Sequence, residues 1–138
     1  LFAGAADRLR ARHGLGVRIL PADVLPGMLR RLDYHGRQVQ LSELLDPASR
    51  AFQLAYQLGL IEAKAEIDAV LAAERLPDKT AERLLVQNLA SYFAAALMMP
   101  YARFHAACEA TGYDIDVLMA RFGAGFEMVA HRLTTLNR

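Results

Sequence analysis

The sequence lacks several features on which common classes of protein depend. It has a single cysteine, Cys108, so an internal disulfide framework is excluded, and this suits the reducing cytosol. No apolar run reaches the roughly 18 residues that a transmembrane helix needs. A net charge of +1 argues against a general binder of polyanions. We therefore expect a cytoplasmic protein without a membrane span.

Motifs for catalysis and for metal binding are also missing. The four histidines are scattered, with no H-x-x-x-H spacing, and there is no Ser-His-Asp arrangement, glycine-rich phosphate loop or C-x-x-C pair. These absences predict that the chain is not an enzyme and holds no metal or other cofactor. What is present is apolar material, because 54% of the residues are hydrophobic. A length of 138 residues fits one domain over residues 1–138.

The first third of the chain predicts a helix followed by a small sheet. Residues 1–13 are rich in alanine and arginine and end at Gly14, which is typical of a helix. Residues 16–20 contain β-branched side chains and end at Pro21, which favours a strand. Residues 28–34 and 37–41 flank His35-Gly36, which predicts a hairpin with Gly36 at positive φ. We expect a three-stranded antiparallel sheet.

A long helix from Asp46 to Arg75 is expected to be the centre of the fold. Asp46 is a strong N-cap residue, Pro47 suits the first helical position, and no further proline occurs before Pro77. Such a helix of about 28 residues would be roughly 40 Å long. Further helices are predicted over residues 79–98, 100–110, 115–122 and 126–136. The fold class is α+β, with the antiparallel sheet packed on the long helix and a helical C-terminal half.

The central stretch resembles the metal-binding helix of the IrrE/ImmA-type metallopeptidases, whose core reads F-x-x-A-H-E-x-G-H. Phe52, Ala55 and Gly59 match it, but Tyr56, Gln57 and Leu60 stand where the two histidine ligands and the catalytic glutamate belong. The family's further carboxylate ligand falls on Gln87, before a segment that reads Ala-Ser-Tyr-Phe-Ala. None of these four side chains can replace the lost function. The resemblance implies a degenerate zincin that keeps the fold without the peptidase.

The second half is similar to the short-chain fatty acyl transcriptional regulators. The similarity rests on the run Y-F-A-A-A-L-M-M-P-Y, which ends at Tyr101, and on H-R-L-T-T-L, which ends at Leu136. This family implies an effector domain that senses a short-chain acyl-coenzyme A, in a bacterial regulator that contacts DNA through an XRE-type domain absent from this chain. The C-terminal segment of the family, cysteine-bearing in relatives, is also absent. A homo-oligomer is expected.

An acyl-coenzyme A needs cationic groups for its phosphates and an apolar slot for its acyl chain. Arg50, in the first turn of the long helix, is the candidate for a phosphate, because a helix N-terminus already favours anions. Tyr101 offers an aromatic wall and a hydroxyl near another helix start. The slot left by the metal is expected to be lined by Tyr56, Gln57, Leu60 and Gln87. Each of these residues has a plain structural reading as well, as a surface or packing side chain.

Two other functions stay open. Residues 115–136 have the spacing of a helix-turn-helix with Gly123 at the turn, but the second helix offers only His131 and Arg132 as basic groups, so we expect it to pack inward. The second alternative is a structural dimerisation module without a ligand. Exposed apolar groups around Met98 and Met99 would support it.

Overall fold

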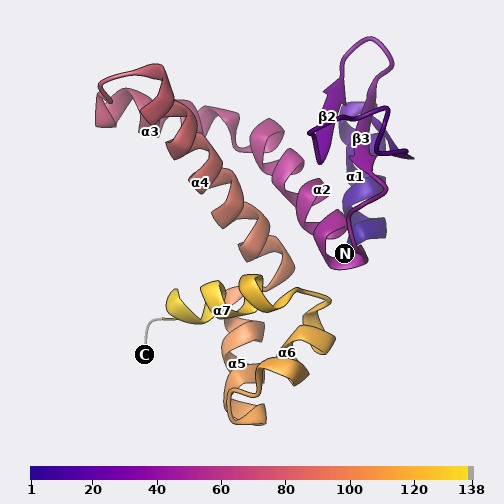
Figure 1. The fold of residues 1–138 in the computed structure, drawn as a ribbon. Helices are drawn as coiled ribbons and strands as arrows, with labels where there is room; N and C mark the ends of the chain where they lie inside the picture. The colour runs from indigo at the N-terminus through magenta and orange to yellow at the C-terminus, as the bar shows by residue number, and fades with distance from the viewer. Residues whose placement is uncertain (137–138) are drawn as a thin grey trace.

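The computed structural model describes residues 1–136, which form seven helices and one three-stranded sheet. The elements in chain order are α1 (Phe2–His13), β1 (Gly16–Leu20), β2 (Arg30–Asp33), β3 (Gln38–Ser42), α2 (Pro47–Glu62), α3 (Lys64–Glu74), α4 (Lys79–Met98), α5 (Tyr101–Thr111), α6 (Ile115–Phe122) and α7 (Phe126–Thr134). Figure 1 shows the sheet with α1 at one end, α5–α7 at the other, and α3 with the start of α4 projecting to the side. The fold is α+β, as predicted.

The helix starts expected at Asp46 and at residue 115 are confirmed. Asp46 Oδ1 accepts a hydrogen bond from the Ser49 N–H at 2.7 Å, and Asp114 Oδ1 accepts one from the Val117 N–H at 3.3 Å. The predicted end of α1 is confirmed as well, because Gly14 has a φ of 65°. These signals were readable because a cap depends only on residues within one turn of the helix end.

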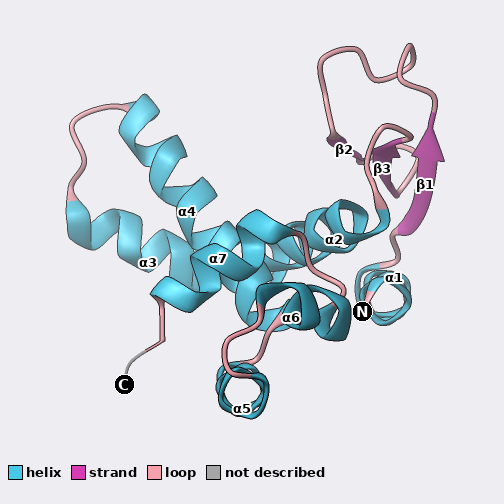
Figure 2. Ribbon diagram, turned by 60° about the horizontal axis from the view of Figure 1, so that its bottom comes forward, coloured by secondary structure: helices cyan, strands magenta, loops and turns pink. Residues whose placement is uncertain are grey.

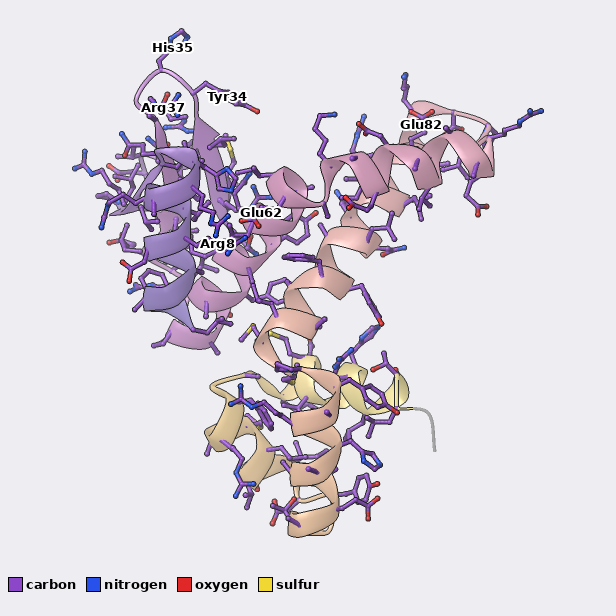
Figure 3. All side chains as sticks on the ribbon, turned by 180° about the vertical axis from the view of Figure 1, so that it is seen from behind. Arg8, Tyr34, His35, Arg37, Glu62 and Glu82 are labelled. Atoms are coloured by element: carbon purple, nitrogen blue, oxygen red, sulfur yellow. The ribbon has the colours of Figure 1, made fainter. Side chains whose placement is uncertain are left out.

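The prediction of an antiparallel sheet is wrong in one of its two pairings. β3 lies in the centre, antiparallel to β2 but parallel to β1, so the strand order is β1-β3-β2. The loop of residues 21–29 connects β1 to β2 and is long enough to pass from one edge of the sheet to the other. In this central place Val39 and Leu41 of β3 are completely buried. The hairpin of β2 and β3 is confirmed, with Tyr34 and His35 at its tip (Figure 3).

The glycine of that hairpin is needed for a reason other than the expected positive φ. Arg37, not Gly36, has the left-handed backbone, with a φ of 51°. The Gly36 N–H donates to Asp33 Oδ1 at 3.0 Å, and a Cβ on Gly36 would lie 2.5 Å from Asp33 Oδ2. Gly36 is therefore required for space beside the Asp33 carboxylate.

The single long helix is also a wrong prediction, because the chain breaks at Ala63. There the backbone leaves the helical region, with φ −101° and ψ 18°, and α2 gives way to α3. Burial also decreases there: Leu54 and Leu58 of α2 are buried, whereas α3 buries Ile67 alone and leaves Ala65 exposed. Figure 1 shows α3 leaving α2 at an angle toward the tip of α4.

Two apolar cores hold the fold together. The first joins α1, the sheet and α2 through Leu9, Val39, Leu41, Leu54 and Leu58. Figure 2 shows α1 and α2 side by side next to the strands. The second joins the end of α4 to α5–α7 through Met98, Met99, Phe104, Cys108, Leu118 and Val129. Cys108 is thus a buried packing residue. Burial of Met98 and Met99 removes the support that their exposure would have given to a dimerisation module.

Candidate functional site on helix α2

An arginine from the sheet fills the face of α2 where the peptidases carry their metal ligands. Arg30 of β2 donates from Nη1 to Gln57 Oε1 and from Nε to Gln53 Oε1, the latter at 3.1 Å. Its guanidinium carbon lies 4.8 Å from the centre of the Tyr56 ring, which is a cation–π contact. The structure therefore brings two of the predicted residues, Tyr56 and Gln57, together around a third that was not predicted.

The cluster of Arg30, Gln53, Tyr56 and Gln57 is partly withdrawn from water. Gln57 is only 3% exposed, and burial lowers the pKa of Arg30 below its ordinary value, with Tyr56 opposing the shift. Each amide oxygen accepts a hydrogen bond from the Arg30 guanidinium, so both acceptors are satisfied. Within residues 1–136, no three His, Cys, Asp or Glu side chains are placed to hold a metal ion together.

Together with Arg31 and Arg37, Arg30 makes the hairpin basic, and a basic hairpin is usually a solvated face; this interpretation is wrong for Arg30. Side chains alternate between the two faces of a strand, so Arg30 and Leu32 share one face of β2, and this face turns toward α2. That alternation was the available signal. It was overlooked because an arginine in a short strand is ordinarily a surface residue.

The other residues predicted for the metal slot are less enclosed. Leu60 is half-buried one turn further along α2, and Gln87 is exposed on α4. The two helices pack closely at Gly59, where an added Cβ would lie 2.7 Å from Cδ1 of Phe93. The matching glycine of the motif thus serves helix packing. Lining of a ligand slot by Leu60 and Gln87 stays a prediction.

Arg50 and Tyr101 lie on different elements. Arg50 is in the first turn of α2, where its Nη2 lies 3.4 Å from the Glu43 carbonyl oxygen and its Nε is buried without a hydrogen-bond partner. Tyr101 is the first residue of α5 and 42% exposed, and its ring is parallel to that of His105 at 6.2 Å. Figure 1 places α5 at the end of the molecule away from the sheet. A ligand that touches both residues would have to extend from α2 to α5.

Two cavities flank the first turns of α2. One, of about 640 Å³, lies between the starts of α1 and α2 and the helix α6; it is lined by Phe2, Pro47, Ala51, Met98, Met119 and Phe122, among others. The other, of about 360 Å³, lies between α2, the residue before β2 and the start of α7. We call it the α2–α7 cavity; it is lined by Leu29, Leu45, Asp46, Ser49, Phe52, Gln53, Gly125, Phe126, Glu127 and Met128. Both have sizes that small-molecule sites commonly have.

The helix-turn-helix spacing of residues 115–136 corresponds to α6 and α7, which pack inward through Leu118 and Val129. One of the two basic groups of α7 is buried: Arg132 is 3% exposed and donates to the Met99 carbonyl at 3.0 Å. The expectation that the whole segment turns inward is wrong at Phe126, which is 57% exposed. Phe126 is the first residue of α7, and its side chain borders the open α2–α7 cavity.

The fold and this site define a metallopeptidase-like domain in which tyrosine and leucine stand at the positions of the histidine ligands and glutamine at that of the catalytic glutamate. An arginine lies between the sheet and the helix at this point. Residues 10–134 match the Peptidase_M78 family, described as the IrrE N-terminal-like domain. The chain belongs to this family.

Its similar proteins are transcription regulators. The chain is 41% identical over 135 residues to the HTH-type transcriptional regulator PrpR of Mycobacterium tuberculosis, an alignment of 96% of this chain and 27% of the relative. It is 33% identical over 138 residues to the propionyl-CoA carboxylase regulator of Cereibacter sphaeroides, covering 100% of this chain and 28% of the relative. The chain therefore spans about a quarter of the length of these relatives.

The fold agrees with a solved structure of the same kind. A Mycobacterium tuberculosis transcriptional regulator superposes on 99% of this chain and 41% of its own chain, with a TM-score of 0.90 and 37% identity. Among the described residues, none of the helices is long and apolar enough to cross a membrane.

Proposed function

We propose that this chain is the effector domain of a cytoplasmic bacterial transcription regulator of short-chain fatty acid metabolism, and that it binds a short-chain acyl-coenzyme A. It acts as a ligand sensor and has no enzymatic activity of its own. The observation that carries this proposal is the Arg30 cluster. The Arg30 guanidinium takes the place that a metal ion has in the peptidases, which argues for a role other than peptide hydrolysis. An apolar cavity lies beside this cluster, and the relatives of the chain are transcription regulators.

The phosphates of the ligand are assigned to Arg50, which lies near the start of α2. Arg50 belongs to the first turn of α2, where the helix dipole favours an anion, although the Ser49 N–H of this turn already donates to Asp46. The buried Nε has no partner, so a donor is available that a phosphate oxygen can satisfy. Asp46 lies near enough to Arg50 to interact with it, and this carboxylate opposes anion binding. We expect Tyr101 to contact the same ligand from α5.

The test of the proposal is calorimetry of Arg50→Ala with propionyl-CoA and with free CoA. Loss of one charge-assisted contact costs about 1.5–3 kcal/mol, or roughly ten- to 150-fold in affinity. Both ligands should weaken by the same factor, because the phosphates are common to them. Arg83→Ala, an exposed arginine on α4, is the matched control. Unchanged affinity in a folded Arg50→Ala variant would remove Arg50 from the site.

A structural dimerisation module remains the second candidate. The observation in its favour is that Leu84 and Tyr92 on α4 are 56% and 59% exposed. Sedimentation analysis separates the two functions, since a dimerisation module would associate without any ligand, and its association would weaken in Leu84→Ser.

A further inference from the structure

The α2–α7 cavity is open at an apolar rim. Leu29 and Phe126, which border it from the sheet side and from α7, are 51% and 57% exposed. Phe52, Leu45 and Met128 continue the apolar wall inside. Burial of apolar surface is favourable by a free energy of about 25 cal/mol per Å². An apolar ligand group that covers these side chains would gain this free energy. The cavity is therefore suited to a small hydrocarbon group.

One polar group in this cavity is held in a fixed orientation. Gln53 lines the cavity, and its Oε1 accepts from Arg30 Nε at 3.1 Å. Arginine has only donors, so the amide atom turned toward Arg30 must be the oxygen. The two N–H groups on Gln53 Nε2 then have no partner among residues 1–136. Since Arg30 is itself held by Gln57 and Tyr56, these donors are preorganised for a carbonyl oxygen.

The charges around the cavity discriminate between kinds of carbonyl compound. Asp46 and Glu127 both line it, so a free carboxylate would meet two like charges. A thioester carbonyl is neutral and avoids that repulsion. Asp46 Oδ1 is already occupied by the Ser49 N–H, which keeps this carboxylate at the helix cap.

We propose that the α2–α7 cavity binds the acyl end of the ligand, with the thioester carbonyl oxygen on Gln53 Nε2 and the hydrocarbon tail between Phe52 and Phe126. This assignment rests on the proposed function for the identity of the complete ligand. It makes Gln53 the residue that recognises the carbonyl and Arg30 its positioning residue. Each methylene that enters the cavity should raise affinity about fourfold, until the cavity is full.

The methionines of the chain allow a direct test by NMR with methyl-labelled methionine. Met128 lines the α2–α7 cavity, whereas Met98 and Met119 line the larger cavity between α1, α2 and α6. The probe is S-propionyl-N-acetylcysteamine, a propionyl thioester without phosphates. The Met128 methyl resonance should shift on titration while those of Met98 and Met119 stay in place. Shifts at Met98 and Met119 alone, or at none of the three with millimolar probe, would overturn the assignment.

The matched variant is Gln53→Glu, which keeps an acceptor for Arg30 and removes both donors. The carboxylate strengthens the contact with Arg30, so the fold is preserved. The thioester should bind about five- to tenfold more weakly, as expected for a lost hydrogen bond beside a new negative charge. Asn88→Asp, the same chemical change at an exposed position of α4, should leave its affinity unchanged. Equal affinity in Gln53→Glu and wild type would remove Gln53 from the site.

The same titrations separate this inference from the proposed function. If free CoA binds in calorimetry but the thioester leaves Met128 unshifted, the acyl cavity is wrong and the coenzyme site stands. If the thioester shifts Met128 and no CoA compound binds, the cavity stands and acyl-coenzyme A sensing falls.

Discussion

The Arg30 cluster predicts a measurable coupling between strand β2 and helix α2. Arg30→Met removes two charge-assisted hydrogen bonds and the contact with the Tyr56 ring, and it leaves the amide of Gln57 buried without a partner. An unsatisfied buried amide costs about 1–3 kcal/mol, and the cation–π contact adds about 0.5–1. Burial of the guanidinium, which lowers its pKa, offsets part of this. We expect a net loss of about 2–3 kcal/mol in the free energy of unfolding.

A second substitution should restore most of that loss. In Arg30→Met with Gln57→Leu, both partners are apolar and no buried amide is left at position 57, so stability should return to within about 1 kcal/mol of wild type. Urea denaturation followed by circular dichroism gives the four free energies of this double-mutant cycle. Arg18→Met, at an exposed position of β1, is the control and should change stability by less than about 0.5 kcal/mol. Additive effects of the two substitutions would refute the pairing of Arg30 with Gln57.

Two further predictions concern the packing of α2. The hydrogen bond from Arg8 at 2.6 Å lowers the pKa of Glu62 from 4.5 to about 2 (Figure 3), so its stabilisation is complete above about pH 4.5 and is lost as the pH falls through 2. Because the Arg8 side chain is 46% exposed, Glu62→Gln should cost only about 1–2 kcal/mol at pH 7 in urea denaturation, and this cost should become small as the pH approaches 2. A difference that is constant with pH would contradict this. Gly59→Ala should cost about 1–2 kcal/mol by the same measurement, because the clash with Phe93 outweighs the gain of about 1 kcal/mol in helix propensity. An alanine variant more stable than wild type would show that Phe93 moves aside freely.

The parts of the fold that were predictable are those set by local chemistry. The caps at Asp46 and Asp114 and the left-handed Gly14 involve neighbours within one helical turn, so the sequence pattern specifies them. The sheet order could not be obtained this way, because the pairing of β1 with β3 depends on contacts across more than 20 residues. The break at Ala63 has no glycine or proline beside it that would mark it in the sequence.

The candidate site shows the same division. The motif comparison located Tyr56 and Gln57 on α2, because a sequence motif fixes positions along one helix. It gave no indication of Arg30, which reaches the site from a strand more than 20 residues earlier. Gln53 was missed because an amide on a helix surface has no signature of its own, and its role depends on Arg30 and on the α2–α7 cavity.

Acyl-coenzyme A sensing is tested most directly by calorimetry of this chain against free CoA, acetyl-CoA and propionyl-CoA. We predict saturable binding of all three, with free CoA weakest and propionyl-CoA about fourfold tighter than acetyl-CoA. The phosphates make the same contribution to the binding free energy of each compound, and one methylene adds about 0.8 kcal/mol. Folded protein that gives no binding heat with any of the three compounds over a range of temperatures would contradict the proposal.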